Sequence, residues 1–277
     1  MSALPPTAAT TPLAERSQVT APDLVAAKKR GERITILTAY DFTLARLLDQ
    51  AGVDCLLVGD SLGMVVQGQP HCLTVTMDQM VYHTQMVARG ARRSLVVADM
   101  PFLSYHLSVE QALRNAGRLV QEGGAAMVKL EGGVARADAI RAIVQAGIPV
   151  MGHVGLTPQS VHEFGGHKVQ RNWDRIMADA QAVAAAGASA IVVECVPADL
   201  ANAITAGLAI PTIGIGAGVG CDGQVLVVHD LLGLYREVQP KFVKRYADLA
   251  QTIEAAVRSY NAEVRGGQFP GAEHAFQ

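Results

Sequence analysis

The sequence predicts an α/β protein that folds as a single (β/α)₈ TIM barrel. The chain has 277 residues, of which 50% are hydrophobic and 17% charged, so it is long enough to bury one large core. Short apolar runs rich in Val and Ile alternate with longer segments of helical periodicity, which indicates a parallel sheet covered by helices on both faces. Eight such units favour a closed barrel. The alternative is an open doubly wound sheet, which is disfavoured because no GxGxxG motif follows the first strand.

The N-terminal elements are a tail and a helix. Residues 1–19 are rich in Pro, Thr and Ala and lack the apolar segment of a secretory signal, so we expect a flexible tail. Thr20 is a typical N-cap, with a proline in the first turn and Asp23 three residues on, which predicts a short helix capping the barrel. The barrel with this helix is expected over 20–264, followed by a C-terminal tail over 265–277.

Eight apolar runs are the predicted strands, and most are bounded by the turn-favouring residues Gly, Pro or Ser. In chain order they cover 34–41, 54–61, 94–102, 126–133, 148–155, 190–197, 210–218 and 224–233. The helices expected among and after them cover 43–51, 76–90, 108–122, 137–146, 174–187 and 244–263. Ser108 with Gln111 has the pattern of a capping box, and the alanine-rich fifth helix ends at Gly187.

Composition and charge exclude several classes of protein. The formal net charge is −2, from 23 basic and 25 acidic residues without blocks of like charge, so we expect neither a nucleic-acid partner nor a membrane partner. No run approaches the roughly 18 apolar residues of a membrane span. The four cysteines are scattered without zinc spacing, which is typical of buried free thiols in a reducing compartment. We therefore expect a cytoplasmic protein.

Titratable residues collect at the C-terminal ends of five consecutive predicted strands, where barrel enzymes carry their chemistry. In chain order they are Asp60, Asp99, Lys129, Glu131, His153 and Glu194. Lys129 and Glu131 lie two residues apart in one strand, so both point to the same face. A single acid at a strand end is commonly a helix cap or an ion-pair partner. Charged groups on five neighbouring strands instead indicate an active site.

The balance of charge at these strand ends predicts a divalent cation. An unpaired buried carboxylate costs several kcal/mol of desolvation free energy, and Asp60, Asp99 and Glu131 would also repel one another. Lys129 offsets only one of these charges. Hard carboxylate oxygens favour Mg²⁺ over zinc. The residues thus indicate a small oxygenated substrate polarised by Mg²⁺, with Lys129 stabilising developing negative charge and Glu194 acting as a base.

Three points stay open at this stage. Lys129 is alternatively a Schiff-base lysine, although the neighbouring acids favour its protonated, non-nucleophilic form. The glycine-rich segment 214–218 is either a phosphate-binding loop or a tight turn, and the lack of a nearby Lys or Arg favours the turn. The loop after the fifth strand, 152–170, is a candidate lid or binding loop, with His153 as a substrate contact.

Motifs along almost the whole chain resemble those of one family. They are, in this order, "TAYD", "VGDSLGMVVQG", "ADMPF", "MVKLEGG", "GHVGLTPQSV", "FGGHKVQ", "VVECVP", "IPTIGIGAG" and "DGQVLVVHDLLG". From about residue 23 to "FPGAEHAF" near the end, the sequence resembles the 3-methyl-2-oxobutanoate hydroxymethyltransferases, also called ketopantoate hydroxymethyltransferases.

This resemblance implies a fold, a reaction and an assembly. Family members are barrels of the phosphoenolpyruvate/pyruvate type that use Mg²⁺. They transfer a hydroxymethyl (one-carbon) group from 5,10-methylenetetrahydrofolate to 3-methyl-2-oxobutanoate through a Mg²⁺-stabilised enolate. The product is 2-dehydropantoate, which leads to pantothenate and coenzyme A. The family is cytoplasmic, and its bacterial members are commonly homodecamers.

The resemblance also implies roles for individual residues. The metal ligands correspond to Asp60, Asp99 and Glu131. The resemblance leaves open whether Glu131 binds the ion directly or through water. The residues implied to contact the keto acid are Asp60, Ser61, Asp99 and Lys129. Glu194 corresponds to the proton acceptor.

Two other functions compete with this transfer reaction. A related Mg²⁺-dependent lyase or mutase would act on a pyruvate-like substrate without folate. A barrel without enzymatic activity would bind a metal–keto acid complex without turnover.

Overall fold

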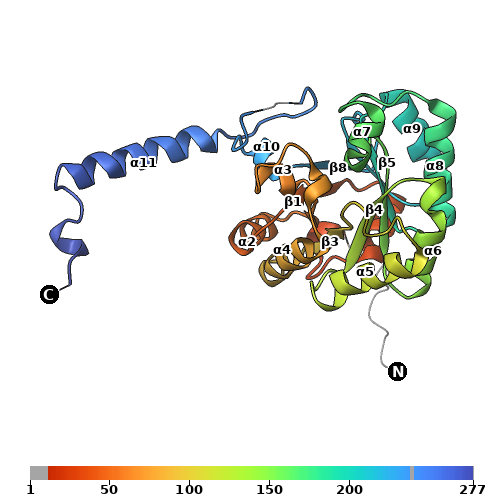
Figure 1. Cartoon of the computed structure of the whole chain (residues 1–277), viewed down its shortest axis with the longest axis horizontal. Helices are drawn as coiled ribbons and strands as arrows, with labels where there is room; N and C mark the ends of the chain where they lie inside the picture. Colours follow the sequence, from red (N-terminus) through yellow and green to blue (C-terminus); the bar gives the residue numbers. More distant parts are fainter. Residues whose placement is uncertain (1–11, 238–239, 277) are drawn as a thin grey trace. The chain divides into compact units, whose positions relative to one another are not determined.

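The eight strands form one closed parallel barrel. A computed structural model describes residues 12–237 and 240–276 (Figure 1). Each strand pairs with its neighbours in sequence, and β8 closes the barrel by pairing with β1. The strands are β1 (Ile34–Thr38), β2 (Cys55–Val58), β3 (Leu95–Asp99), β4 (Met127–Glu131), β5 (Val150–Gly155), β6 (Ala190–Glu194), β7 (Thr212–Ile215) and β8 (Gly223–Leu226). The predicted barrel is confirmed, and its closure excludes the open sheet.

Within Met1–Leu226, helices cover the outside of the barrel (Figure 1), and the helices α10 and α11 belong to the segment after β8. The longer ones are α1 (Ala21–Arg30), α2 (Phe42–Gln50), α4 (Met77–Gly90), α5 (Val109–Gln121), α6 (Ala137–Gln145), α8 (Trp173–Ala185), α9 (Ala198–Gly207) and α11 (Leu249–Arg265). Single-turn helices are α3 (Leu62–Val65), α7 (Val161–Phe164) and α10 (Val228–Leu231). The predicted N-cap is present, because the Thr20 backbone N–H and hydroxyl both donate to Asp23 Oδ2, at 2.9 and 2.6 Å.

The alternation of side chains along each strand positions the site. In β3, Leu95 and Val97 belong to the buried core cluster, and the next residue on that face is Asp99. In β4, Met127 belongs to the same cluster, and Lys129 and Glu131 follow it on that face. Apolar side chains therefore fill the lower part of the barrel, and charged side chains begin where the strands end.

The segment before α1 packs against the barrel where the sequence predicted a flexible tail. Leu13 is 4% exposed and Val19 is 1% exposed, and both belong to the core cluster together with Leu24 of α1. The Val19 N–H donates a hydrogen bond to the Arg93 carbonyl, and the Arg93 guanidinium donates one to the Leu13 carbonyl at 2.7 Å. Part of the predicted tail, residues 1–11, lies outside the described residues.

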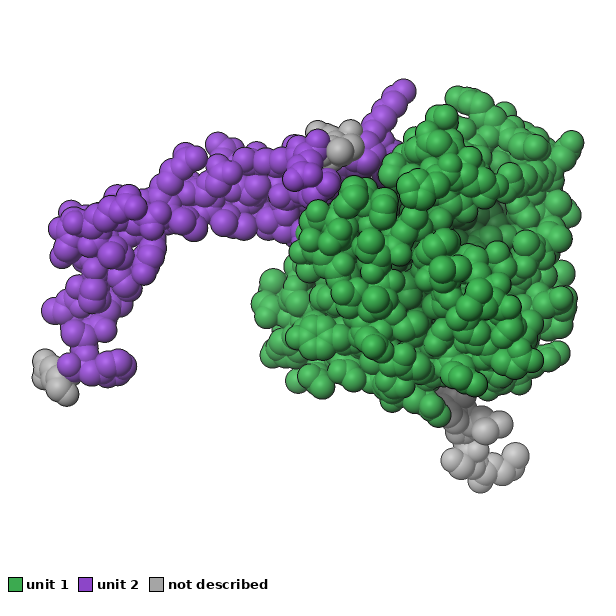
Figure 2. Space-filling view, viewed as in Figure 1, with its two compact units in different colours: residues 1–226 green, residues 227–277 purple. Residues whose placement is uncertain are grey.

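The chain divides into two compact units, Met1–Leu226 and Val227–Gln277, which Figure 2 shows in different colours. The division therefore falls at the end of β8, whereas the sequence predicted one domain up to residue 264. Within the second unit, backbone hydrogen bonds tie Tyr246 and Leu249 to the end of α10. No helix among the described residues combines the length and the apolar character that a bilayer crossing needs.

The four cysteines are buried and free, as predicted: Cys55, Cys72, Cys195 and Cys221. Burial raises the pKa of the Cys195 thiol to about 12. It also raises the pKa values of Cys55 and Cys72. These thiols stay protonated and unreactive at neutral pH.

Candidate active site

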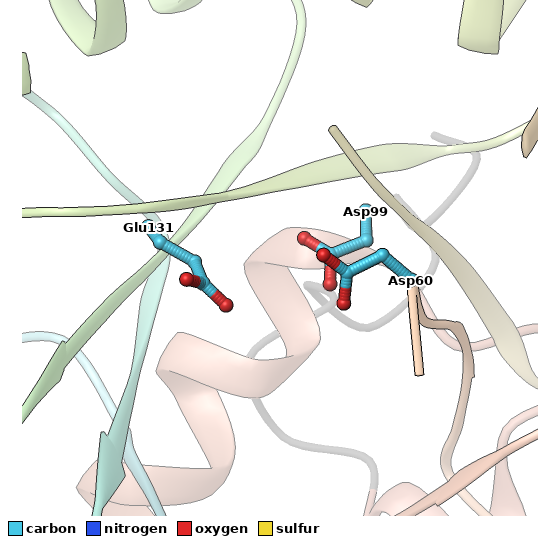
Figure 3. A group of neighbouring side chains, drawn as sticks. All are labelled: Asp60, Asp99 and Glu131. Atoms are coloured by element: carbon cyan, nitrogen blue, oxygen red, sulfur yellow. The ribbon is translucent and has the colours of Figure 1, made fainter. Parts of the chain in front are cut away.

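Three carboxylates converge at the C-terminal mouth of the barrel. Asp99 and Glu131 are the last residues of β3 and β4, and Asp60 lies in the turn after β2, beyond the strand end at which the sequence placed it. One oxygen of each carboxylate lies within 4.8 Å of the others, and all three residues are buried. The carboxylates of Asp60 and Asp99 lie beside each other, and that of Glu131 faces them (Figure 3).

Positive charge compensates these carboxylates unevenly, because Lys129 and His153 lie beside Glu131, whose pKa is lowered. Burial raises the pKa of Asp60 well above its ordinary value, and the charges of Asp99 and Glu131 raise it further. Oδ1 of Asp99 and Oε1 of Glu131 are buried and accept no hydrogen bond from the described residues. Three buried hard oxygen donors, two of them unsatisfied, fit a divalent cation such as Mg²⁺.

Lys129 is a buried cation among these acids. Its Nζ lies 2.6 Å from Oδ2 of Asp99 and 3.7 Å from Oε1 of Glu131. Burial acts to lower the pKa of Lys129, but Asp99, Glu131 and Asp60 together raise it above its ordinary value. The amine is therefore a protonated ammonium, which argues against a Schiff-base role.

His153 connects the carboxylates to Glu194. Its Nδ1 lies 3.3 Å from Glu131 Oε1, and its Nε2 lies 3.2 Å from Glu194 Oε2. Burial and the charge of Lys129 act to lower the pKa of His153, but Glu131 and Glu194 outweigh them and raise it to about 9. The Glu194 side chain is 13% exposed, whereas that of Glu131 is 2% exposed. Glu194 is thus the acid of this pair that an incoming molecule reaches more easily.

The comparison with known proteins identifies the family. A family model described as ketopantoate hydroxymethyltransferase matches residues 18–272. The chain belongs to this family. The 3-methyl-2-oxobutanoate hydroxymethyltransferase of Moorella thermoacetica is 59% identical over 269 residues, covering 96% of this chain and 100% of that protein. The protein of the same name from Pelobacter propionicus is 57% identical over 264 residues, covering 94% and 98%. The predicted family is confirmed, and so is the prediction of a transferase enzyme.

Several solved structures have the same barrel fold as this ketopantoate hydroxymethyltransferase family member. Phosphoenolpyruvate phosphomutase from Streptomyces platensis subsp. rosaceus is 16% identical with a TM-score of 0.63, covering 93% of this chain and 92% of that one. A 2,3-dimethylmalate lyase of the PEP mutase/isocitrate lyase superfamily is 18% identical with a TM-score of 0.60, covering 93% and 89%. These likenesses confirm the predicted barrel type, and at such low identity they support the fold alone.

Gln159 is a site residue that sequence reasoning missed. Its Nε2 donates to Asp60 Oδ2 and to the Met100 carbonyl, each at 2.9 Å, and its backbone N–H donates to Glu131 Oε2 at 3.0 Å. Its Oε1 accepts from the Tyr105 hydroxyl at 2.6 Å. One buried residue therefore links two of the three carboxylates, Asp60 through its side chain and Glu131 through its backbone. The signal was present, because Gln159 lies in the loop after β5 that the sequence marked as a binding loop.

Two further predicted features, Ser61 and the glycine-rich segment 214–218, are present in this ketopantoate hydroxymethyltransferase family member. Ser61 follows Asp60, and its hydroxyl lies 2.8 Å from that of Tyr40. Gly216 and Gly218 both have left-handed backbones, with φ of 62° and 85°, which agrees with a tight turn over 214–218. The structure brings the predicted charged residues together, and their roles in binding and catalysis stay predictions.

Proposed function

We propose that the chain transfers the one-carbon unit of 5,10-methylenetetrahydrofolate to 3-methyl-2-oxobutanoate, giving 2-dehydropantoate and tetrahydrofolate. One observation carries this proposal: three buried carboxylates with unsatisfied oxygens lie at the same barrel mouth as Lys129 and the His153–Glu194 pair. The names of the relatives supply the keto acid, and the family resemblance supplies the folate.

The carboxylates of Asp60, Asp99 and Glu131 would hold Mg²⁺, with Glu131 bound directly or through water. When bound, the cation would supply Lewis acidity, which polarises the keto carbonyl and acidifies the C3 proton of the substrate. The two unsatisfied oxygens, on Asp99 and Glu131, support this assignment. Asp99 Oδ1 in particular is costly to bury without a further cation, since Lys129 contacts the other oxygen of Asp99.

The other side chains would bind the keto acid and move its proton. The Lys129 ammonium, held at 2.6 Å from Asp99, would donate to the substrate oxygen that gains negative charge. Ser61 and His153 would contact the substrate and orient it. Glu194 would accept the C3 proton, because it is the more exposed carboxylate and the imidazole holds it in place.

The transfer is balanced by one water molecule. The electron pair left at C3 forms the new bond to the methylene carbon of the folate, and water supplies the oxygen of the new hydroxyl group. The proton held by Glu194 and one proton of the water end on the two folate nitrogens that release the carbon. Tetrahydrofolate then leaves.

Proton NMR in D₂O tests this proposal directly. The purified protein is mixed with 3-methyl-2-oxobutanoate and either Mg²⁺ or EDTA, and methylenetetrahydrofolate is added afterwards. We expect Mg²⁺-dependent loss of the C3 proton signal, followed by ketopantoate once folate is present. If folded protein with Mg²⁺ bound gives neither loss of the C3 proton signal nor ketopantoate, the result would contradict the proposal and favour a lyase or mutase acting without folate.

We also propose a homo-oligomer, a decamer by family resemblance, located in the cytoplasm. No residue of α11 is buried in the single chain, yet one face carries the exposed apolar residues Ile253, Val257, Tyr260 and Val264. An apolar stripe of this kind supports association with another copy of the chain. Free buried thiols support a reducing compartment.

A further inference from the structure

A cavity of about 400 Å³ lies beside the carboxylates, on the side of the loops after β4 and β5. This volume is in the range of ligand-binding pockets. The lining residues that matter here are Tyr105, His106, Glu131, Arg136, Gln159 and Arg175. The keto acid is small and is already served by the carboxylates and Lys129, so the cavity is available to a second, larger substrate.

The cavity shares a wall with the proposed metal site. Glu131 both lines the cavity and belongs to the three carboxylates. Gln159 also lines it and donates to Asp60 Oδ2 at 2.9 Å. A molecule held in the cavity therefore lies next to the groups that would activate the keto acid, as a one-carbon donor must.

The loop that forms one side of the cavity is fixed in place. The Val134 backbone N–H donates to Asp179 Oδ1 of α8 at 2.9 Å. A Cβ atom at Gly133 would lie 2.1 Å from the Asp179 side chain, so only glycine allows this approach. The short 3₁₀-helix Val134–Arg136 follows directly, so the backbone of Arg136 is held in place before any ligand binds.

The chemistry of the lining suits an aromatic anion. Arg136 is half-buried, and its guanidinium makes no hydrogen bond or ion pair within the described part of the chain. The rings of Tyr105 and His106 pack with centroids 4.1 Å apart. Burial and the charge of Arg136 lower the pKa of His106 to about 4, so this ring is neutral, and its Nδ1 lacks a hydrogen-bond partner among the described residues. An unpaired cation beside an aromatic pair complements a ligand with rings and carboxylates.

We propose that this cavity binds the folate co-substrate, with Arg136 holding a carboxylate of its glutamate and the Tyr105–His106 pair contacting its aromatic part. This inference rests on the proposed transfer reaction and adds the location of the one-carbon donor. Arg175 at the rim is more exposed, but its Nε lies 3.8 Å from Asp179 Oδ2, so the remaining carboxylate of the glutamate would face solvent.

The test separates the two substrates. Exchange of the C3 proton in D₂O needs no folate, so Arg136→Gln should keep the wild-type exchange rate while its KM for methylenetetrahydrofolate rises about 10- to 100-fold. Arg136→Lys should recover part of this loss. Arg141→Gln removes an exposed arginine of α6 outside the cavity lining and should change neither value.

A truncated donor sharpens the test. The methylene derivative of tetrahydropteroate lacks the glutamate, so its KM should be high in the wild type and should not rise further in Arg136→Gln. An unchanged KM for methylenetetrahydrofolate in Arg136→Gln, or an equal loss with both donors, would overturn the inference. Lost proton exchange in this variant would also overturn it, by assigning Arg136 to the keto acid. A wild type that exchanges but never transfers would instead contradict the proposed function, and the inference with it.

Discussion

Asp60 is the residue whose charge is least compensated in the site. Its pKa is raised by burial and by Asp99 and Glu131, so its ionised form opposes folding when no cation is bound. For a carboxylate with a raised folded-state pKa, this unfavourable contribution appears as the pH rises above the unfolded value. It is absent in acid, where the group is protonated in both states. At neutral pH the metal-free protein should therefore be less stable than its Mg²⁺ complex.

Asp60→Asn should raise the melting temperature of the metal-free protein at pH 7 and remove its response to Mg²⁺. In the wild type, Mg²⁺ at 100 times its Kd should add about 2.7 kcal/mol of stability, or roughly 5–10 °C for a chain of this size. Calorimetry with Mg²⁺ and with EDTA measures both effects, and Asp174→Asn on α8 is a matched surface control. Asp60→Asn and Asp99→Ala should also lose Mg²⁺-dependent proton exchange with the fold intact. Wild-type turnover in either would remove the metal hypothesis.

Gln159 should hold the carboxylates in place for the metal. Gln159→Leu removes the hydrogen bonds of its side chain to Asp60 and Tyr105, while the backbone N–H still donates to Glu131. Affinity for Mn²⁺, followed by electron paramagnetic resonance, should fall about 10- to 100-fold, as is usual when a partner of metal ligands is lost. Gln145→Leu at the exposed end of α6 is the control. Equal affinity in wild type and Gln159→Leu would show that the carboxylates need no such support.

At the scale of elements, Asp49 joins α2 to the start of β3. Its Oδ1 accepts from the backbone N–H groups of Arg93 and Ser94, at 2.9 and 2.7 Å. Burial acts to raise the pKa of Asp49, but these hydrogen bonds lower it below its ordinary value of 3.8. A carboxylate with a depressed folded-state pKa stabilises the fold above its unfolded pKa, and this contribution is lost as the pH falls through the folded value.

Asp49→Asn should therefore lower the free energy of unfolding by about 1–2 kcal/mol at pH 7, because a neutral amide accepts more weakly than a carboxylate. Urea titrations should show this difference staying constant down to about pH 4 and shrinking below it. Asp41→Asn, an exposed cap at the other end of α2, provides a comparison for an ordinary capping loss. A difference between wild type and Asp49→Asn that persists at pH 2 would rule out ionisation as its origin.

The elements differ in how far the sequence predicts them. Seven of the eight strands are found within their apolar runs, because buried parallel strands need nearly continuous apolar residues. The eighth, β8, begins one residue before its predicted run 224–233, and the later part of that run forms α10. The acids at the strand ends are predictable because charge is rare beside such runs. Gln159 is not, because a neutral amide in a loop follows no periodicity. Leu13 and Val19 are also missed, since single apolar residues among Pro and Thr do not reveal that they pack against the core.

At the scale of the whole molecule, the second unit lacks a core of its own along α11. None of its 17 residues is buried, and an isolated helix of this length is marginally stable in water. The sequence predicted a final helix over 244–263 but had no signal for what would cover it. Hydrophobic periodicity identifies an apolar face and not the partner of that face.

Val257→Glu should weaken self-association by placing a charge in the apolar stripe of α11. Size-exclusion chromatography with light scattering should show a smaller assembly for this variant. Ala262→Glu, on the opposite face of the same helix, should keep the wild-type mass. A wild-type protein that elutes as a monomer would contradict the proposed homo-oligomer.

The buried cysteines allow thiol reagents to measure how often each part of the fold opens to solvent. A protonated, buried sulfur reacts only in chains that have opened, so each modification rate measures a local opening equilibrium. Cys55 in β2 reports on the barrel, and Cys72, in the loop before α4 and beside Asp60, reports on the mouth. Mass spectrometry of alkylated protein would then detect keto acid binding, since a bound keto acid should protect Cys72. The slower alkylation of Cys55 would report unfolding.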